Sequence, residues 1–220
     1  SLFNALRCKH DETAAHCFRV AVTCSHWAEQ MGLSEQERAS LEIASLLHDI
    51  GKIGVADNVL LKPGELTADE VLVMDRHWEA GLDILRASCS SEPVLEIVRH
   101  ASSWYDGTRK VDDRQGEDIP LGARMLAIAD AFDAMTSDQL YRRGASREQG
   151  LSELFRFAGK QFDPKLVQHF ADLNDSQPFG RFFTAARTWL KSLDVKSHLA
   201  HWKFHEHPTA APNKGLVLPF

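Results

Sequence analysis

Apolar residues recur at helical intervals along almost the whole chain. One stripe of residues three or four positions apart comprises Cys17, Val20, Ala21, Cys24, Ala28 and Met31. A second stripe comprises Leu121, Met125, Ile128, Phe132 and Met135. This spacing places apolar side chains along one face of an α-helix, where other helices can bury them. No alternating pattern of useful length indicates a β-strand, so the sequence predicts an all-α fold.

Helix-capping signals divide this pattern into separate helices. A capping box, in which Ser or Thr is followed three residues later by Glu or Gln, begins predicted helices at Ser34, Thr67 and Ser146. Pro93 and Pro164 suit the first turn of two more. Together with the two stripes, these signals predict a bundle of about six or seven helices over residues 1–173.

Residues 174–220 are predicted to form a C-terminal extension. Its amphipathic helix would carry Phe182, Ala186, Trp189 and Leu193. The histidines that follow are His198, His201, His205 and His207. Their loose spacing leaves two interpretations, a metal-binding segment or a connector toward an adjoining domain. Because the chain begins at Ser1 rather than Met, we expect it to belong to a longer protein.

The composition restricts the class of protein. With 220 residues, 44% hydrophobic and 25% charged, the chain is long enough to form a core without disulfides. A net charge of −6 without a Lys/Arg cluster argues against a nucleic-acid polymer as partner. No apolar run approaches the roughly 20 residues that span a bilayer, and no signal peptide is apparent. Four cysteines without a CxxC pair suit a reducing compartment, so we expect a cytoplasmic protein.

The dipeptide His48-Asp49 is the first candidate for chemistry. It follows a predicted helix and precedes Gly51, which permits a sharp backbone turn. Adjacent side chains on a helix point about 100° apart, but at a helix end both can reach one ion. Alone, such a dipeptide occurs by chance in many chains, and a surface pair is the favoured interpretation.

Two further pairs lie at helical spacing. Glu12 and His16 are four residues apart and could hold one cation from the same helix face. Asp130 and Asp133 are three apart, and apolar neighbours make a buried Asp130 costly without a cation or hydrogen bonds. Each pair has a structural alternative: Glu12 can favour a helix N-terminus, and Asp133 can cap a helix or form a salt bridge.

Taken together, the motifs resemble the HD-GYP subgroup of the HD phosphohydrolase superfamily over residues 5–172. The segments that carry the resemblance are HDIGKIGVADNVLLKPGELTADEVLVMDRHWEAG, IPLGARMLAIADAFDAMTSDQLYR and QFDPKLV. The resemblance implies an all-α HD-domain bundle whose two- or three-metal site hydrolyses cyclic di-GMP to pGpG or GMP through a metal-bridged hydroxide. It also implies two divalent ions, with one or three as alternatives, and Fe or Mn as the metal.

The resemblance assigns roles position by position. The implied metal ligands are His16, His48, Asp49, His77 and Asp130, with Asp49 as a bridge and Glu12 as a ligand found in some trinuclear members. Asp49 and Lys52 are the implied catalytic residues, and Lys52 would contact the scissile phosphate. The candidate substrate-binding residues are Arg142, Asp133 and Arg109. Arg109, with Lys110, would replace lost contacts of the family's substrate loop, and the alternative is that the two are solvated surface charges.

The sequence departs from the family pattern in the segment after His77 and its helix. The family has two histidines and a glutamate before an Asp-Gly, where this chain has Ala101, Ser102 and Ser103. His100 can replace one of those histidines as a ligand only if one residue has been inserted. The positions of the GYP motif are occupied by Arg109, Lys110 and Val111, so the motif itself is absent. Gln139 stands at a position where the family has an arginine.

These features favour a metal-dependent phosphodiesterase that acts on cyclic di-GMP or a related cyclic dinucleotide. The alternative is a degenerate domain that binds metal or nucleotide without turnover and regulates an adjoining signalling module. A third interpretation is one-metal hydrolysis of a simpler nucleotide or phosphate ester. A homodimer is one possible assembly.

Overall fold

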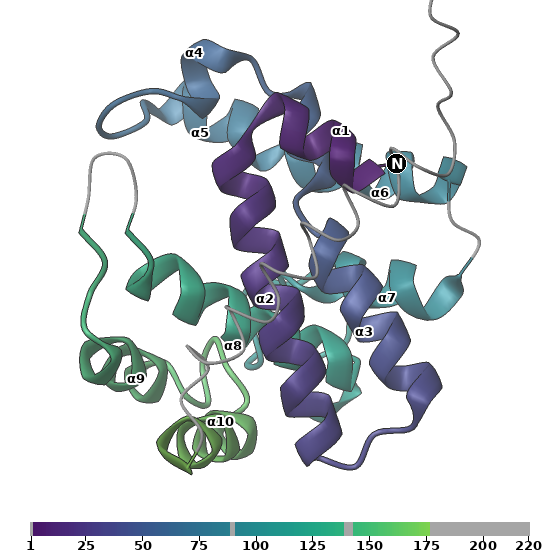
Figure 1. Ribbon diagram of the computed structural model, residues 1–220, viewed down its shortest axis with the longest axis vertical. Helices are drawn as coiled ribbons and strands as arrows, with labels where there is room; N and C mark the ends of the chain where they lie inside the picture. Colours follow the sequence, from purple (N-terminus) through teal and green to yellow (C-terminus); the bar gives the residue numbers. More distant parts are fainter. Residues whose placement is uncertain (1, 89–90, 139–142, 177–220) are drawn as a thin grey trace, which may run out of the picture. The chain divides into compact units, whose positions relative to one another are not determined.

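The computed structural model describes residues 2–88, 91–138 and 143–176, which belong to one compact unit (Figure 1). These residues form helices and no β-strand, so the predicted all-α class is confirmed. In chain order the elements are α1 (Leu2–Lys9), α2 (Asp11–Gln30), α3 (Glu35–Leu47), the 3₁₀ helix η1 (Ile50–Gly54), α4 (Asp57–Leu60), α5 (Ala68–Asp75), α6 (His77–Ser88), α7 (Glu92–His100), the 3₁₀ helix η2 (Gly116–Asp118), α8 (Leu121–Thr136), α9 (Arg147–Arg156) and α10 (Pro164–Ser176). Among them, none is long and apolar enough to cross a bilayer.

The described residues contain more helices than the six or seven expected. Helices α1 and α4 are short, at 8 and 4 residues, and show little of the apolar periodicity that predicts longer helices. The helix predicted to begin at Thr67 is two helices, α5 and α6, that meet at Arg76. There the Met74 carbonyl accepts hydrogen bonds from the Arg76 amide and from His77 Nδ1. The break therefore sets the direction of the His77 side chain.

The three predicted capping boxes are confirmed. The side chains of Ser34, Thr67 and Ser146 accept hydrogen bonds from the amide three residues later. The Glu or Gln side chain at that later position accepts a hydrogen bond from the amide of the cap residue. Such a cap stabilises a helix by roughly 1 kcal/mol. The caps therefore define where α3, α5 and α9 begin.

Helix α2 packs along α3 and α8, as Figure 1 shows. Its Trp27 is fully buried, lies edge-on to Phe170 at 5.0 Å and donates a hydrogen bond of 2.9 Å to His169 Nδ1. Cys17 and Cys24 on the same helix are buried free thiols, as the apolar stripe predicts. Burying a large apolar side chain contributes roughly 1.5–3 kcal/mol, so this core holds α2 rigidly beside the ends of α3 and α8.

Gly51 allows the turn after α3 to approach α6 unusually closely. A Cβ on Gly51 would lie 1.8 Å from the His77 carbonyl oxygen and 2.6 Å from the Gly81 amide nitrogen. Both atoms belong to the backbone and cannot rotate away. The absence of a side chain at Gly51 therefore lets His77, the first residue of α6, lie beside Asp49.

We expect Gly51→Ala to destabilise the fold and Gly54→Ala to leave it intact. Overpacking against backbone should lower the free energy of unfolding by about 2 kcal/mol or more, because η1 and α6 must separate. Gly54 is the matched control in the same 3₁₀ helix, since a Cβ there meets nothing within 4 Å. Urea unfolding of both variants checks this, and equal midpoints would contradict it.

Candidate metal centre

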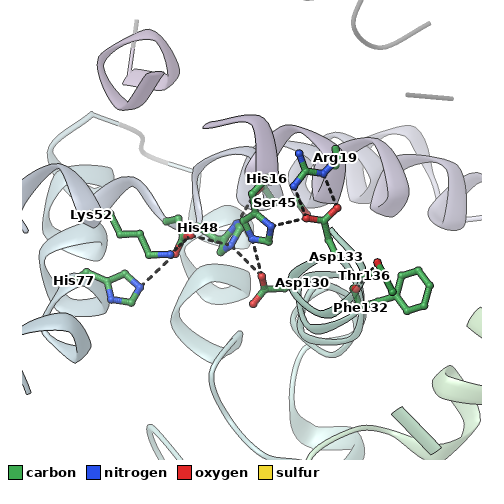
Figure 2. Close-up of polar contacts among 11 residues, drawn as sticks. His16, Arg19, Ser45, His48, Lys52, His77, Asp130, Phe132, Asp133 and Thr136 are labelled. Carbon is green, nitrogen blue, oxygen red and sulfur yellow. Dashed lines mark hydrogen bonds and ion pairs between the residues drawn. The ribbon is translucent and has the colours of Figure 1, made fainter. Parts of the chain in front are cut away.

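Side chains from four separate parts of the chain meet at the ends of α3 and α6. Their polar contacts form a row from His77 and Lys52 through His48 and His16 to Asp133 and Arg19 (Figure 2). Ligand atoms of His16, His48 and Asp49 all lie within 4.8 Å of one another. The contributing elements are α2 for His16 and Arg19, the turn after α3 for His48 and Asp49, η1 for Lys52, α6 for His77, and α8 for Asp130 and Asp133.

Backbone carbonyls orient two of the imidazoles. His48 Nδ1 lies 2.8 Å from the Ser45 carbonyl oxygen, and His77 Nδ1 lies 2.5 Å from the Met74 carbonyl oxygen. A carbonyl can only accept, so each Nδ1 carries a proton, and Nε2 is the ring nitrogen left for an ion to bind. Both Nε2 atoms are buried and lack a hydrogen-bond partner among the described residues. This arrangement is costly in an ordinary core and typical of histidines that bind metals.

Asp49 lies between these imidazoles and Lys52. Its Oδ1 is 3.3 Å from His77 Nε2, and its Oδ2 is 3.7 Å from His48 Nε2 and 2.5 Å from Lys52 Nζ. Burial of this 3% exposed residue would raise the pKa of its carboxyl, but the charges of Lys52 and His48 hold that pKa well below its usual range. An ionised carboxylate with each oxygen facing a different imidazole has the geometry to bridge two cations.

His16 connects the two aspartates of α8. Its Nε2 is 2.9 Å from Asp130 Oδ1 and its Nδ1 is 2.7 Å from Asp133 Oδ2. Burial alone would lower the pKa of His16, but hydrogen bonds to both carboxylates raise it to about 9. Burial favours the neutral form of Asp130, yet His16 and His48 hold the pKa of that carboxyl below its usual range. The His16 imidazole therefore lies between the two aspartates and is protonated at neutral pH.

The donor set fits a divalent ion. Imidazole nitrogens and carboxylate oxygens suit Fe or Mn and are acceptable to Zn. The observation that carries this fit is the pair of unpartnered, buried Nε2 atoms of His48 and His77, aimed at Asp49. His16 and Asp130 complete the side of the cluster that α2 and α8 form, with Asp130 Oδ1 3.6 Å from His48 Nε2.

Other sequence-predicted residues are placed differently. Glu12 is exposed in the first turn of α2, one turn before His16. His100 is buried and neither of its ring nitrogens has a hydrogen-bond partner among the described residues, but the carboxylates that it faces are Asp112, at 3.4 Å, and Glu96, at 3.7 Å. Arg109 is exposed in the loop after α7. Arg142, with its neighbours Gln139 and Tyr141, lies outside the described residues.

The three positions that depart from the family pattern follow α7. Ala101 and Ser103 are buried and Ser102 is half-buried, and none can supply an imidazole or a carboxylate. The loop that follows is held without the GYP residues. The amides of Tyr105 and Asp106 donate hydrogen bonds to the carbonyls of Gln161 and Lys160, at 3.1 and 2.9 Å.

Sequence reasoning missed Arg19. Its Nε and Nη2 donate to the two carboxylate oxygens of Asp133 at 2.7 and 2.8 Å. Arg19 lies three residues after His16, so helical spacing could have placed it on the same face. The spacing does not reveal the partner of Arg19, because Asp133 lies on α8, more than a hundred residues later in the sequence.

Two curated proteins are similar to most of this chain. A 3'3'-cGAMP-specific phosphodiesterase of Vibrio cholerae is 38% identical over 173 residues, which cover 76% of this chain and 33% of that protein. A cyclic di-GMP phosphodiesterase response regulator of Xanthomonas campestris is 40% identical over 169 residues, which cover 76% of this chain and 44% of that protein. The chain thus spans less than half the length of these two relatives.

Solved structures support the fold. The crystal structure of a cyclic GMP-AMP-specific phosphodiesterase of V. cholerae superposes with a TM-score of 0.59 at 25% identity, covering 81% of this chain and 48% of that one. The HD domain of an L. monocytogenes phosphodiesterase, in complex with cyclic-di-AMP, superposes with a TM-score of 0.56 at 17% identity, covering 80% of this chain and 97% of that one. A family model described as the HD domain matches residues 3–166. The chain therefore belongs to the HD-domain family, which confirms the resemblance drawn from its motifs.

Proposed function

We propose that the chain is a metal-dependent phosphodiesterase that hydrolyses cyclic di-GMP or a related cyclic dinucleotide such as 3'3'-cGAMP. The observation that carries the proposal is the convergence of the buried Nε2 atoms of His48 and His77 on the ionised Asp49. The names of the relatives, cyclic di-GMP and cGAMP phosphodiesterases, support the substrate class.

In this proposal His16, His48, Asp49, His77 and Asp130 hold two divalent ions, Fe or Mn, with Glu12 as a ligand to a third. When bound, such ions activate the attacking water and neutralise charge on the phosphate. Asp49 would be a ligand to both ions. Lys52, held 2.5 Å from Asp49, keeps its charge because that carboxylate raises its pKa against the effect of burial, and it orients the phosphate.

Substrate contacts outside the metal site are part of the same proposal. Arg109 is exposed on the loop that replaces the GYP segment, where its guanidinium can reach a phosphate or a guanine. Arg142 adds a second cation. Asp133, assigned to substrate from the sequence, is engaged by Arg19 and His16, which favours a role in holding His16.

The assembly around the domain also belongs to this proposal. We assign the catalytic domain to residues 1–173 and a C-terminal helix and connector to residues 174–220. The greater length of the relatives supports an adjoining signalling module. The free thiols of Cys8, Cys17 and Cys24 suit work in the reducing cytoplasm, as a monomer or a homodimer.

A second candidate function is regulation without turnover. It is favoured by Ala101, Ser102 and Ser103, which stand where the family has two histidines and a glutamate. With these ligands replaced, the second ion would rely on His77, Asp49 and water. A domain that binds one metal or a nucleotide could still signal to an adjoining module.

Turnover separates the two candidates. We expect protein purified without oxygen and reconstituted with Fe(II) or Mn(II) to convert cyclic di-GMP or 3'3'-cGAMP to linear products, resolved by chromatography. Asp49→Ala should abolish both turnover and metal retention, because it removes the bridge. Metal-loaded wild type that forms no product would favour the regulatory function, and full metal content in Asp49→Ala would disprove the site.

Metal content distinguishes His77 from His100. We expect His77→Ala to lose about one equivalent of metal, because its Nε2 faces Asp49. His100→Ala should keep the wild-type content, since His100 contacts Asp112 and Glu96. Both histidines are buried, so replacing either one by Ala leaves a similar gap in the protein interior. A difference in metal content between the two variants therefore reflects the lost ligand rather than the gap. Loss of an equivalent from His100→Ala, measured by elemental analysis, would make His100 a ligand after all.

Metal binding should depend on pH through His16 and His48, because acidic groups around both imidazoles raise their pKa values. Below its pKa of about 9, His16 is protonated on Nε2, and that proton must leave before the nitrogen can bind an ion. Apparent Mn(II) affinity should therefore keep rising, by up to about tenfold per pH unit, between pH 7 and pH 9. An unperturbed histidine would level off near pH 6.5. Calorimetric titration across this range tests it, and constant affinity above pH 7 would contradict it.

A further inference from the structure

Arg19, Asp133 and His16 form a chain of hydrogen bonds that ends at the candidate metal centre. The guanidinium of Arg19 donates to both oxygens of Asp133, at 2.7 and 2.8 Å. Asp133 Oδ2 accepts from His16 Nδ1 at 2.7 Å, and His16 Nε2 points to Asp130. The side chain of Asp133 is 10% exposed and that of His16 is 16% exposed, so water competes little for these contacts.

The three histidines of the centre are oriented in two different ways. His48 and His77 donate Nδ1–H to carbonyls of Ser45 and Met74, three residues earlier in the chain. These acceptors are backbone atoms whose position the local helix sets. His16 instead donates to a side chain from another helix, and a carboxylate can rotate unless something holds it. The bidentate contact with Arg19 holds it.

We propose that Arg19 is a positioning residue for the metal centre, acting through Asp133 on His16. The clamp holds the Asp133 carboxylate in one orientation, in which it accepts a hydrogen bond from His16 Nδ1 and directs Nε2 toward Asp130. The proposal rests on the proposed metal-dependent function. It also explains why Asp133 has no oxygen left for substrate, since Arg19 and His16 use both.

A purely structural role is the competing explanation, because the same contact ties α2 to α8. The two roles predict different results. A structural tie would change the stability of the metal-free protein and would act independently of the His16 orientation. A positioning role changes metal affinity. The effect of replacing Arg19 then disappears in a variant in which Asp133 has also been replaced, because Arg19 acts on His16 only through Asp133.

The experiment measures Mn(II) affinity of the full chain by calorimetric titration, with thermal unfolding of each metal-free variant. Arg19→Gln should weaken binding about tenfold to hundredfold, the usual effect of removing an outer partner of a ligand. Arg38→Gln is the matched control, because Arg38 makes an exposed ion pair with Glu42 on α3. It should stay within about twofold of wild type. Asp133→Asn should weaken binding like Arg19→Gln, and the double variant should be no weaker than the poorer single variant.

Each outcome decides between the alternatives. Wild-type affinity in Arg19→Gln, or losses that multiply in the double variant, would overturn the positioning role while leaving the proposed function intact. Wild-type protein that binds no Mn(II) would instead overturn the proposed function. If Arg19→Gln fails to fold, Arg19→Lys retains the charge without the two-pronged geometry. It should bind with intermediate affinity, and wild-type affinity there would equally overturn the proposal.

Discussion

The burial of Asp49 is the constraint on which the rest of the site depends. A carboxylate with 3% exposure is unfavourable in a protein core unless cations or hydrogen bonds surround it. Lys52 supplies one cation from the next turn of chain, and two imidazoles face the oxygens. To bring His77 this close, α6 must begin against η1, and the missing side chain of Gly51 makes that approach possible. The need of the Asp49 carboxylate for cations and hydrogen bonds thus accounts for the turn after α3, for the break between α5 and α6, and for glycine at position 51.

The two sides of the centre differ in how completely they are built. On the side of α2 and α8, His16, Asp130, Asp133 and Arg19 form a continuous network of short contacts. On the side after α7, small residues stand where the family places metal ligands. Ala101 and Ser103 are nevertheless buried, so the backbone keeps a course that packs against the core. In the proposed function, this divergence would remove donor atoms to the second ion and leave the fold intact.

Local signals explain what could be predicted from the sequence. Capping boxes involve residues three apart, and apolar stripes need only one helix, so α2, α3, α8 and α9 were predictable. The motif residues His16, His48, Asp49, His77 and Asp130 were assigned through a family resemblance, and the structure brings them together. The break at Arg76 and the contact between Arg19 and Asp133 were missed. Both depend on atoms that tertiary packing supplies, and neither leaves a periodic trace in the sequence.

Cationic or imidazole groups face each of the three aspartates of the centre. Asp49, Asp130 and Asp133 all have pKa values below their usual range, so all three carry charge at neutral pH. Lys52 and Arg19 are paired with two of them, and the imidazoles of His16 and His48 face the third, Asp130. In the proposed function, Nε2 of His16 would bind a divalent ion, and the proton on that nitrogen would have to leave first. The same imidazole would then both neutralise Asp130 and serve as a ligand.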